Sequence, residues 1–371
     1  MAERKTRALF EEAGATARQT APSAAPGAAE RDRAAGRSRL MLWQFAIAVL
    51  VGVMVLVGGM TRLTDSGLSI TEWNLVTGIL PPLSAEGWQA EFAKYQTIPE
   101  FREINPDMTL AEFKPIYWWE WGHRFLGRIV GLAYLLPFLW FWLKGAIPPG
   151  WTARLFIPGV LIAVQGAIGW WMVTSGLTAR VDVAPYRLAV HLGLAFVIFY
   201  LVVWNGLALG RSAAELLAAR RRRFRSLLGF AGGVTAVLFA QIVVGAMVAG
   251  YDAGRGYTDW PLMQGSFLPP HDTAEAIWQF THRMLGYLVV ALLAFFWWKA
   301  RASGHRRVAF WAGIAALGGL AQMLWGIVTL VNGAAWGYAI FHQIGALVLL
   351  FVLLRAKFEI AYPAEQRIER A

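Results

Sequence analysis

The sequence contains no cysteine and few charged residues for its length. Without cysteine the chain forms no disulfide bond, attaches no haem through thioether links and ligates no iron–sulfur cluster through thiolates. Histidine is then the side chain left to ligate a transition metal. Charged residues make up 15% of the 371 residues, whereas soluble domains carry about 25%. This scarcity of charge argues against a soluble protein with one large core.

Long apolar runs fill most of the chain. Hydrophobic residues account for 57% of the sequence and tryptophan occurs 19 times, and the mean hydropathy is +0.47. A run of about 20 apolar residues is long enough to cross a bilayer as a helix. Eight such runs are predicted, at residues 41–61, 123–143, 154–174, 187–209, 228–250, 282–299, 307–331 and 338–356. The chain is therefore predicted to be a polytopic membrane protein, surrounded by lipid.

The net charge of +11 raises the question of nucleic-acid binding. The basic residues, however, cluster between apolar runs, where Lys and Arg set membrane orientation. Residues 210–226 hold six arginines against the single acid Glu215, whereas residues 62–122 hold nine acidic and four basic residues. We therefore expect no nucleic-acid partner. By the positive-inside rule, both termini are predicted to be cytoplasmic in a bacterial inner (plasma) membrane, with 62–122 outside.

Two parts of the sequence repeat each other. Residues 58–73 match 245–260, and a Gln-x-x-x-Gly pattern at Gln165 recurs at Gln322. Four helices per repeat give both repeats the same orientation, so a pseudo-twofold axis along the membrane normal relates them. The predicted fold class is an all-α polytopic membrane protein with eight transmembrane helices, arranged as two parallel four-helix-bundle repeats.

Five segments follow from this organisation. They are a disordered cytoplasmic tail (1–40), an N-terminal four-helix repeat with a long external loop 62–122 (41–209), a basic cytoplasmic linker (210–226), a C-terminal four-helix repeat (227–356) and a cytoplasmic tail (357–371). Equivalent residues of the two repeats are 187 positions apart before the first external loop and 159 positions apart after it. That loop therefore carries about 28 additional residues in the first repeat. We expect a short helix near 84–96 capped by Ser84, and another near 110–120 starting at Thr109.

Four histidines lie near the outer ends of alternate predicted spans: His123, His191, His282 and His342. Imidazoles at matching depth on parallel helices can ligate opposite faces of one planar iron macrocycle, as in haem proteins. Two pairs therefore make two candidate haem sites. Histidines that only bond across a bundle are the structural alternative, and no His-x-His or Met-rich grouping supports zinc or copper. His271 and His305 fall on connections, where we expect them to be solvated.

Glu120 precedes His123 by three residues, and Gln279 stands at the matching place before His282. Glutamine keeps the shape of glutamate but does not ionise, as expected if one half does chemistry and the other holds a permanent cofactor. A surface acid or a charge at a helix N-terminus is the alternative for Glu120. Three arginines are candidate partners of haem propionates or anchors for lipid headgroups: Arg124, Arg128 and Arg283.

Several of these motifs together resemble the haem A synthase family. They are Glu-Trp-x-His-Arg at Glu120, Gln-Phe-x-His-Arg at Gln279, the matched His191 and His342, and Gly-Gly-Met-Thr-Arg-Leu-Thr-x-Ser-Gly-Leu-Ser over 58–69. The likeness is closest to the cysteine-free branch shared by alphaproteobacteria and mitochondria and covers roughly residues 41–356. Some members carry a cysteine pair in the first outer loop, so no thiol-dependent step is expected here.

The resemblance implies an oxidoreductase that acts on a methyl group. It would oxidise the C8 methyl of haem O to a formyl group by successive hydroxylations, giving haem A for terminal oxidases. By resemblance, His123 and His191 bind the substrate haem O, His282 and His342 hold a resident haem b, and Glu120 is the catalytic carboxylate. The implied partners are haem O synthase, a haem-A-using oxidase and electron donor or acceptor proteins. A homo-oligomer is compatible with the sequence.

The alternative function is a diheme membrane cytochrome b that relays electrons to or from quinone. It accounts for four histidines equally well, but not for Glu120 opposite Gln279 or for the enlarged first loop. A transporter is a further alternative because parallel repeats occur in that class. No paired Gly or Pro interruptions at the middle of the spans support it.

Overall fold

The computed structural model describes residues 27–269 and 271–364, and within these ranges it contains helices and no β-strand. Eight of the described helices are long and apolar enough to cross a membrane. They are α2 (Ala28–Leu63), α5 (Leu110–Leu143), α6 (Thr152–Val173), α7 (Pro185–Leu209), α9 (Arg225–Gly250), α11 (Ala274–Ala302), α12 (Arg306–Val331) and α13 (Trp336–Ala361). The all-α class and the eight spans predicted from the sequence are confirmed.

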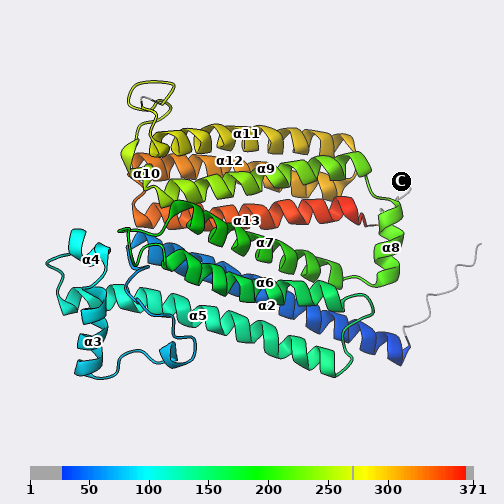
Figure 1. The fold of residues 1–371 in the computed structure, drawn as a ribbon. Helices are drawn as coiled ribbons and strands as arrows, with labels where there is room; N and C mark the ends of the chain where they lie inside the picture. The colour runs from blue at the N-terminus through cyan, green and yellow to red at the C-terminus, as the bar shows by residue number, and fades with distance from the viewer. Residues whose placement is uncertain (1–26, 270, 365–371) are drawn as a thin grey trace, which may run out of the picture.

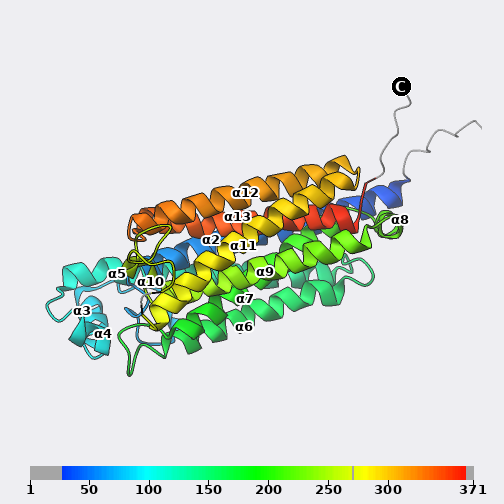
Figure 2. The ribbon, with the colours of Figure 1, turned by 90° about the horizontal axis from the view of Figure 1, so that it is seen from above.

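The long helices lie roughly side by side in one elongated bundle (Figures 1 and 2). In the first half of the chain α2 packs against α5 and α7, and α6 packs against α5 and α7. In the second half α9 packs against α11 and α13, and α12 packs against α11 and α13. Contacts of α7 with α9 and of α2 with α13 join the halves. The pseudo-twofold relation between them stays a prediction.

The short elements gather at the two ends of the bundle (Figure 1). One end carries α3 (Ala85–Tyr95), α4 (Pro99–Glu103), η1 (Thr77–Ile79) and α10 (Ala253–Gly256). The opposite end carries α8 (Ala213–Arg221) and both ends of the described chain. The enlarged loop between α2 and α5 therefore lies at the end away from the arginine-rich segment.

The first helix starts earlier than the sequence pattern suggested. The expectation of disorder over 1–40 is wrong for residues 28–40, because α2 begins at Ala28 and runs without a break into the first span. Ala and Arg are good helix formers, and Gly36 costs only about 1 kcal/mol in a helix interior. At the other end, α13 continues to Ala361, into the segment expected to be a tail. Residues 1–26 and 365–371 lie outside the described residues.

Both helix starts predicted in the first external loop are present. The Ser84 hydroxyl accepts a hydrogen bond from Gly87 N at 3.1 Å and caps α3. Thr109 and Glu112 form a capping box at the start of α5. The helix expected near 110–120 is not separate, however, because it continues into the second span as α5. His123 consequently lies well inside this helix rather than in its first few residues.

An aromatic cluster holds the external loop against the outer part of α5. Tyr95 and Phe113 are fully buried, with ring centroids 5.2 Å apart. Phe92 and Phe101 pack on the same cluster from α3 and α4. Burial of each such side chain contributes about 1.5–3 kcal/mol. The cluster thereby positions α4, an element not anticipated from the sequence, above the outer end of the first half.

Candidate active site

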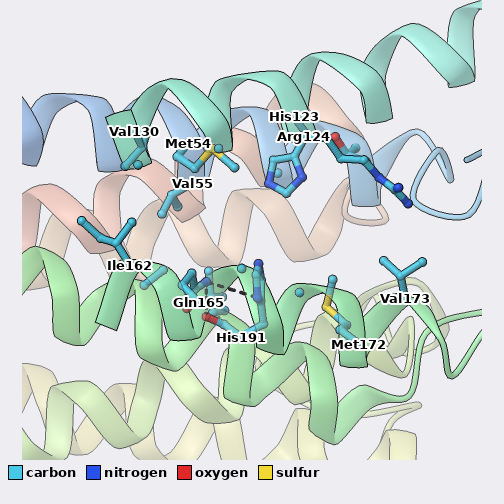
Figure 3. A pocket seen from close by; sticks show the side chains of 18 of the residues that line it. Met54, Val55, His123, Arg124, Val130, Ile162, Gln165, Met172, Val173 and His191 are labelled. Atoms are coloured by element: carbon cyan, nitrogen blue, oxygen red, sulfur yellow. Dashed lines mark hydrogen bonds between the residues drawn. The ribbon is translucent and has the colours of Figure 1, made fainter. Parts of the chain in front are cut away.

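A cavity of about 760 Å³ lies among α2, α5, α6 and α7 in the first half. Its lining is mainly apolar, with polar side chains gathered toward the end that carries α3 and α4. His123 from α5 and His191 from α7 enter it from opposite sides (Figure 3). Pockets for cofactors and drug-sized ligands span roughly 300–1,000 Å³ and combine apolar walls with a few polar groups. The cavity therefore has the size and lining of a site for a large, flat, apolar ligand.

Each histidine of this pair packs against a helical glycine. A β-carbon at Gly58 would lie 2.9 Å from His123 Nε2, and one at Gly169 would lie 3.1 Å from His191 Cε1. Gln165 Nε2 donates to His191 O at 2.9 Å and lies 3.2 Å from its Nδ1. The four-residue spacing of Gln165 and Gly169 within one helix thus places both residues against one imidazole.

The second pair of histidines has matching surroundings. Gly245 and Gly326 pack against His282 and His342, with virtual β-carbons 3.0 and 2.7 Å from the respective Cε1 atoms. Gln322 Nε2 donates to His342 O and lies 3.2 Å from its Nδ1. The glutamine and glycine contacts of His191 thus recur at His342, whereas the role of the four histidines as ligands is not tested by these contacts.

The second pair also fits an iron macrocycle between its two rings. The ring centroids of His282 and His342 are 6.2 Å apart. A metal ligated by both imidazoles needs two metal–nitrogen bonds of about 2 Å each, and each ring adds a radius of roughly 1 Å. The two ring centroids would then lie about 6 Å apart. His282 Nδ1 is buried without a hydrogen-bond partner. Within the described ranges, no group of three or more His, Asp or Glu side chains is arranged for a bare metal ion.

Glu120 is a buried carboxylate with donors on both oxygens. Its Oε1 accepts from Arg124 Nε at 3.0 Å and from Nη2 at 2.6 Å. Its Oε2 accepts from Ile70 N at 2.8 Å and lies 2.8 Å from the Ser69 hydroxyl, the shortest contact of that hydroxyl. The residue is 2% exposed and lines the cavity together with His123. These contacts exclude the surface-acid alternative.

Gln279 occupies the corresponding place in the second half with reversed polarity. Its Nε2 donates to Tyr257 O at 3.0 Å and to Ala253 O at 2.8 Å. Its Oε1 accepts one bond from Arg283 Nη2 at 3.2 Å. The amide therefore joins α11 to the segment between α9 and α11, as Glu120 joins α5 to the loop between α2 and α5, without placing a negative charge there.

The three arginines hold the external loops to the long helices. Arg124 donates to Ile70 O and Glu72 O, and Arg128 donates to Asn74 O and Leu75 O. Arg283 donates to the carbonyls of Leu262 and Tyr257. Arg128 Nη1 and Arg283 Nε have no partner and are buried. The loop contacts are observed, and contact with propionates stays a prediction.

Sequence reasoning missed three residues that the fold brings to these sites. Ser69 lies within the motif over 58–69, but nothing in that motif indicated a contact with Glu120. Gln241 Nε2 donates to His282 O at 3.0 Å, and no matched Gln exists in the first half. Glu100 on α4 lines the cavity at 6% exposure. The expectation for His305 was also wrong, because it is 7% exposed and packs against Phe224.

Comparisons with known proteins agree with these motifs. A family model described as cytochrome oxidase assembly protein matches residues 41–354. The chain is 48% identical to a protein of Dinoroseobacter shibae over 99% of both chains. It is 50% identical to one of Ruegeria pomeroyi over 96% of this chain and 97% of the relative, and 46% identical to one of Cereibacter sphaeroides over 97% of both. Each relative is named Heme A synthase.

Proposed function

We propose that this chain, which belongs to the cytochrome oxidase assembly protein family, is an oxidoreductase that converts haem O to haem A. The reaction oxidises the C8 methyl group of haem O to a formyl group by successive hydroxylations. Near-full-length similarity to relatives named Heme A synthase supports it. The diheme electron-transfer alternative is not favoured by any of these relatives.

The observation that carries the proposal is the difference between the two halves. Beside the cavity stands Glu120, a carboxylate with four donors around it, whereas the same place in the second half holds the uncharged Gln279. A pure electron relay needs no such difference, because both haems would do the same work. A protein that stabilises developing charge at only one of its two macrocycles does need a difference between the two halves.

The substrate site is assigned to the first half. His123 and His191 would hold haem O in the cavity, and His282 and His342 would hold a resident haem b. When bound, haem b supplies one-electron transfer between the substrate site and an external partner. Gln241, which bonds His282, corresponds in the motif alignment to Met54, which lines the cavity and lacks donors. A ligand with fewer supporting bonds suits a macrocycle that must leave after reaction.

Glu120 is assigned a fixed negative charge rather than the role of a base. All the strong acceptor positions of its two oxygens face donors, two of them from one guanidinium. Charge-assisted bonds of this kind are stronger than bonds between neutral groups, and here they leave no acceptor position of the carboxylate free. A fixed carboxylate can stabilise positive charge that develops at the methyl carbon as electrons are withdrawn.

Location and partners follow from the same proposal. The protein lies in a bacterial inner membrane with both termini in the cytoplasm, because the α8 end carries the arginine-rich segment 210–226. The active site then opens toward the outer face. Haem O synthase supplies the substrate, a terminal oxidase uses the product, and electron-transfer proteins serve the resident haem. Association into a homo-oligomer remains compatible with this arrangement.

Extraction of haems from membranes tests the function. Membranes that contain haem O synthase alone are compared with membranes that also contain this chain, and the haems are separated by reverse-phase chromatography. We expect haem O to decline and haem A to appear, with a hydroxylated haem between them. A folded, haem-loaded protein that leaves haem O unchanged under aerobic conditions would support the diheme cytochrome instead.

A further inference from the structure

Glu100 is one of four carboxyl groups that line the cavity, with Glu120, Asp65 and Asp182, and it has no part in the proposed role of Glu120. It lies on α4, within the additional external residues between Pro82 and His123 that have no counterpart in the second half. It is 6% exposed, lines the cavity, and its Oε2 is buried without a hydrogen-bond partner. The enlarged loop thus brings one extra acid to the substrate half alone.

The groups that face Glu100 leave its charge uncompensated. Three acids raise its pKa: Asp182, Glu120 and Asp65. Arg62 has the opposing effect, but it is already engaged by Asp65 at 2.9 Å, Asp182 at 3.8 Å and Asp252 at 2.6 Å. Tyr95 packs nearby as a neutral phenol, and its pKa is raised by burial and by Glu100. Burial first, and then these acids, raise the pKa of Glu100 to about 8.

Glu120 and Glu100 therefore have opposite environments at one site. Glu120 has donors at both oxygens, whereas Oε2 of Glu100 is buried without a hydrogen-bond partner. Two carboxyl groups whose surroundings push their proton affinities apart commonly divide the roles of fixed charge and proton exchange. A group that titrates near the working pH is best suited to the second role.

The proposed function requires such a proton exchanger. With water as oxygen donor, the methyl group and one water give the formyl group, four protons and four electrons. The electrons pass to one-electron acceptors outside the cavity, by way of the resident haem. The protons must leave a largely apolar cavity in which Glu120 has no free acceptor position. Their release requires a carboxylate that accepts one proton at a time and passes it to external water.

The geometry points to Glu100 as the proton-exchanging residue of the cavity, which carries protons from the substrate oxygen to the outer face. This role rests on the proposed function and deepens it. Each of the two oxidations breaks one C–H bond of the substrate carbon, passes two electrons to the one-electron acceptors and releases two protons, one from that carbon and one from the oxygen. The ionised carboxylate takes these protons one at a time as the oxygen bonds to, or forms the double bond with, the carbon. The neutral acid then releases the proton outward, past the segment that carries α4. Glu120, through its bonds to Arg124 and Ile70 N, keeps the loop in place.

Matched variants of α4 test this role in the full-length, haem-loaded protein. Glu100→Gln keeps the shape of the side chain and removes proton exchange, whereas Glu103→Gln changes an exposed acid on the same helix. Conversion of added haem O is followed from roughly pH 6 to 9, and the absorption spectrum of bound haem reports correct folding. The carbonyl stretch of protonated carboxyl groups is recorded by infrared difference spectroscopy over the same range.

We expect the wild-type rate to rise with pH through about 8, because the ionised form of Glu100 accepts the proton. Glu100→Gln should lower the rate by about a hundredfold and remove this pH dependence. It should also remove one carboxyl band that disappears in the wild type as the pH passes about 8. Glu103→Gln should behave as the wild type. Glu100→Asp, which keeps the carboxyl, should restore a pH-dependent rate.

Two different outcomes separate the two proposals. A wild-type protein that makes haem A, beside a Glu100→Gln variant with an unchanged rate and pH profile, overturns the role of Glu100 alone. A wild-type protein that binds haem but makes no haem A overturns the proposed function, even if the carboxyl band is present. If Glu100→Gln binds no haem, the Glu100→Asp variant decides, and a pH-independent rate in that variant overturns the role.

Discussion

Glu120 and Arg124 form a buried two-bond ion pair one helical turn apart on α5, with Oε1 2.6 Å from Nη2 and 3.0 Å from Nε. The same guanidinium reaches the carbonyls of Ile70 and Glu72 and so holds the first external loop. In the second half, Arg283 donates a single, longer bond of 3.2 Å to Gln279 Oε1, and both residues donate to loop carbonyls. The scaffold function is therefore common to both halves, and the buried charge belongs to the first half alone.

Glu120→Gln should retain the fold and both haems but abolish haem A formation. Gln279 shows that an amide at this place is compatible with the loop contacts, so the change removes the charge more than the architecture. Loss of one preorganised electrostatic group commonly costs about 10²–10³ in rate. Haem content and haem A yield are measured together, with Gln279→Glu as the reciprocal variant. A normal yield from Glu120→Gln would remove Glu120 from the mechanism.

The histidine pairs should separate into two classes when each is replaced by alanine. His282→Ala and His342→Ala are expected to lose the b-type haem spectrum of the purified protein, because each would remove a proposed ligand of the proposed resident haem. His123→Ala and His191→Ala should retain that spectrum and lose conversion of haem O. Unchanged b-haem content in the first two variants would contradict the division between resident and substrate sites.

Met54→Gln should make the substrate site retain its macrocycle. The glutamine amide would support His123 as Gln241 supports His282, through a bond to its backbone carbonyl. Outer contacts of this kind change metal-site affinity by about 10–100-fold. Dissociation of haem A from the variant is timed against the wild type, and Gln241→Met is expected to loosen the resident haem. Equal dissociation rates in all three proteins would show that these positions do not control release.

The stability of the protein should depend on pH through Glu100. Its folded pKa of about 8 lies above the ordinary value of 4.5, mainly because burial disfavours the charge. The folded state therefore binds the proton more tightly than the unfolded state, and its contribution to stability is full below pH 4.5 and lost as pH rises through 8. Relative to Glu100→Gln, the wild type should lose on the order of a few kcal/mol over this range. Melting temperatures that move in parallel would disprove the linkage.

A cluster at the opposite end of the bundle should control stability rather than activity. Glu359 on α13 is fully buried and lies 2.6 Å from Arg355, 3.2 Å from Arg307 and 3.8 Å from Arg211. Glu359→Ala leaves these cations without their shared partner, a change that commonly costs about 3–5 kcal/mol. We expect a lower melting temperature in detergent with normal haem A formation per folded molecule. A melting temperature equal to that of the exposed-site variant Glu103→Gln would contradict this role.

Several local features of the fold followed from short stretches of sequence. The eight spans were predictable because apolar length alone decides whether a helix can cross a bilayer. The caps at Ser84 and Thr109 were predictable because a capping side chain bonds a backbone group three residues away. The start of α2 was missed because its first turns have no apolar pattern and are helical as a continuation of the span that follows them in the chain.

The candidate site was predictable in its ligands but not in its electrostatics. Motif repetition identified His123, His191, His282, His342 and Glu120, because residues at matched places in two similar halves stand out in one sequence. The donors of Glu120 include Ser69 and Ile70, about 50 residues away in the chain, which no local pattern connects to it. Glu100 has no matched partner at all, so repetition gave no signal for it.

The identity of the chemical groups was thus readable from composition and repetition, because residue types and their spacing are properties of the chain itself. Which groups surround each acid was settled only when the chain folded. Folding surrounds Glu120 with donors and leaves Glu100 beside other acids without a cation of its own. Proton affinity depends on the neighbours within a few ångströms of a carboxyl group, and for these two residues most of those neighbours come from distant parts of the chain.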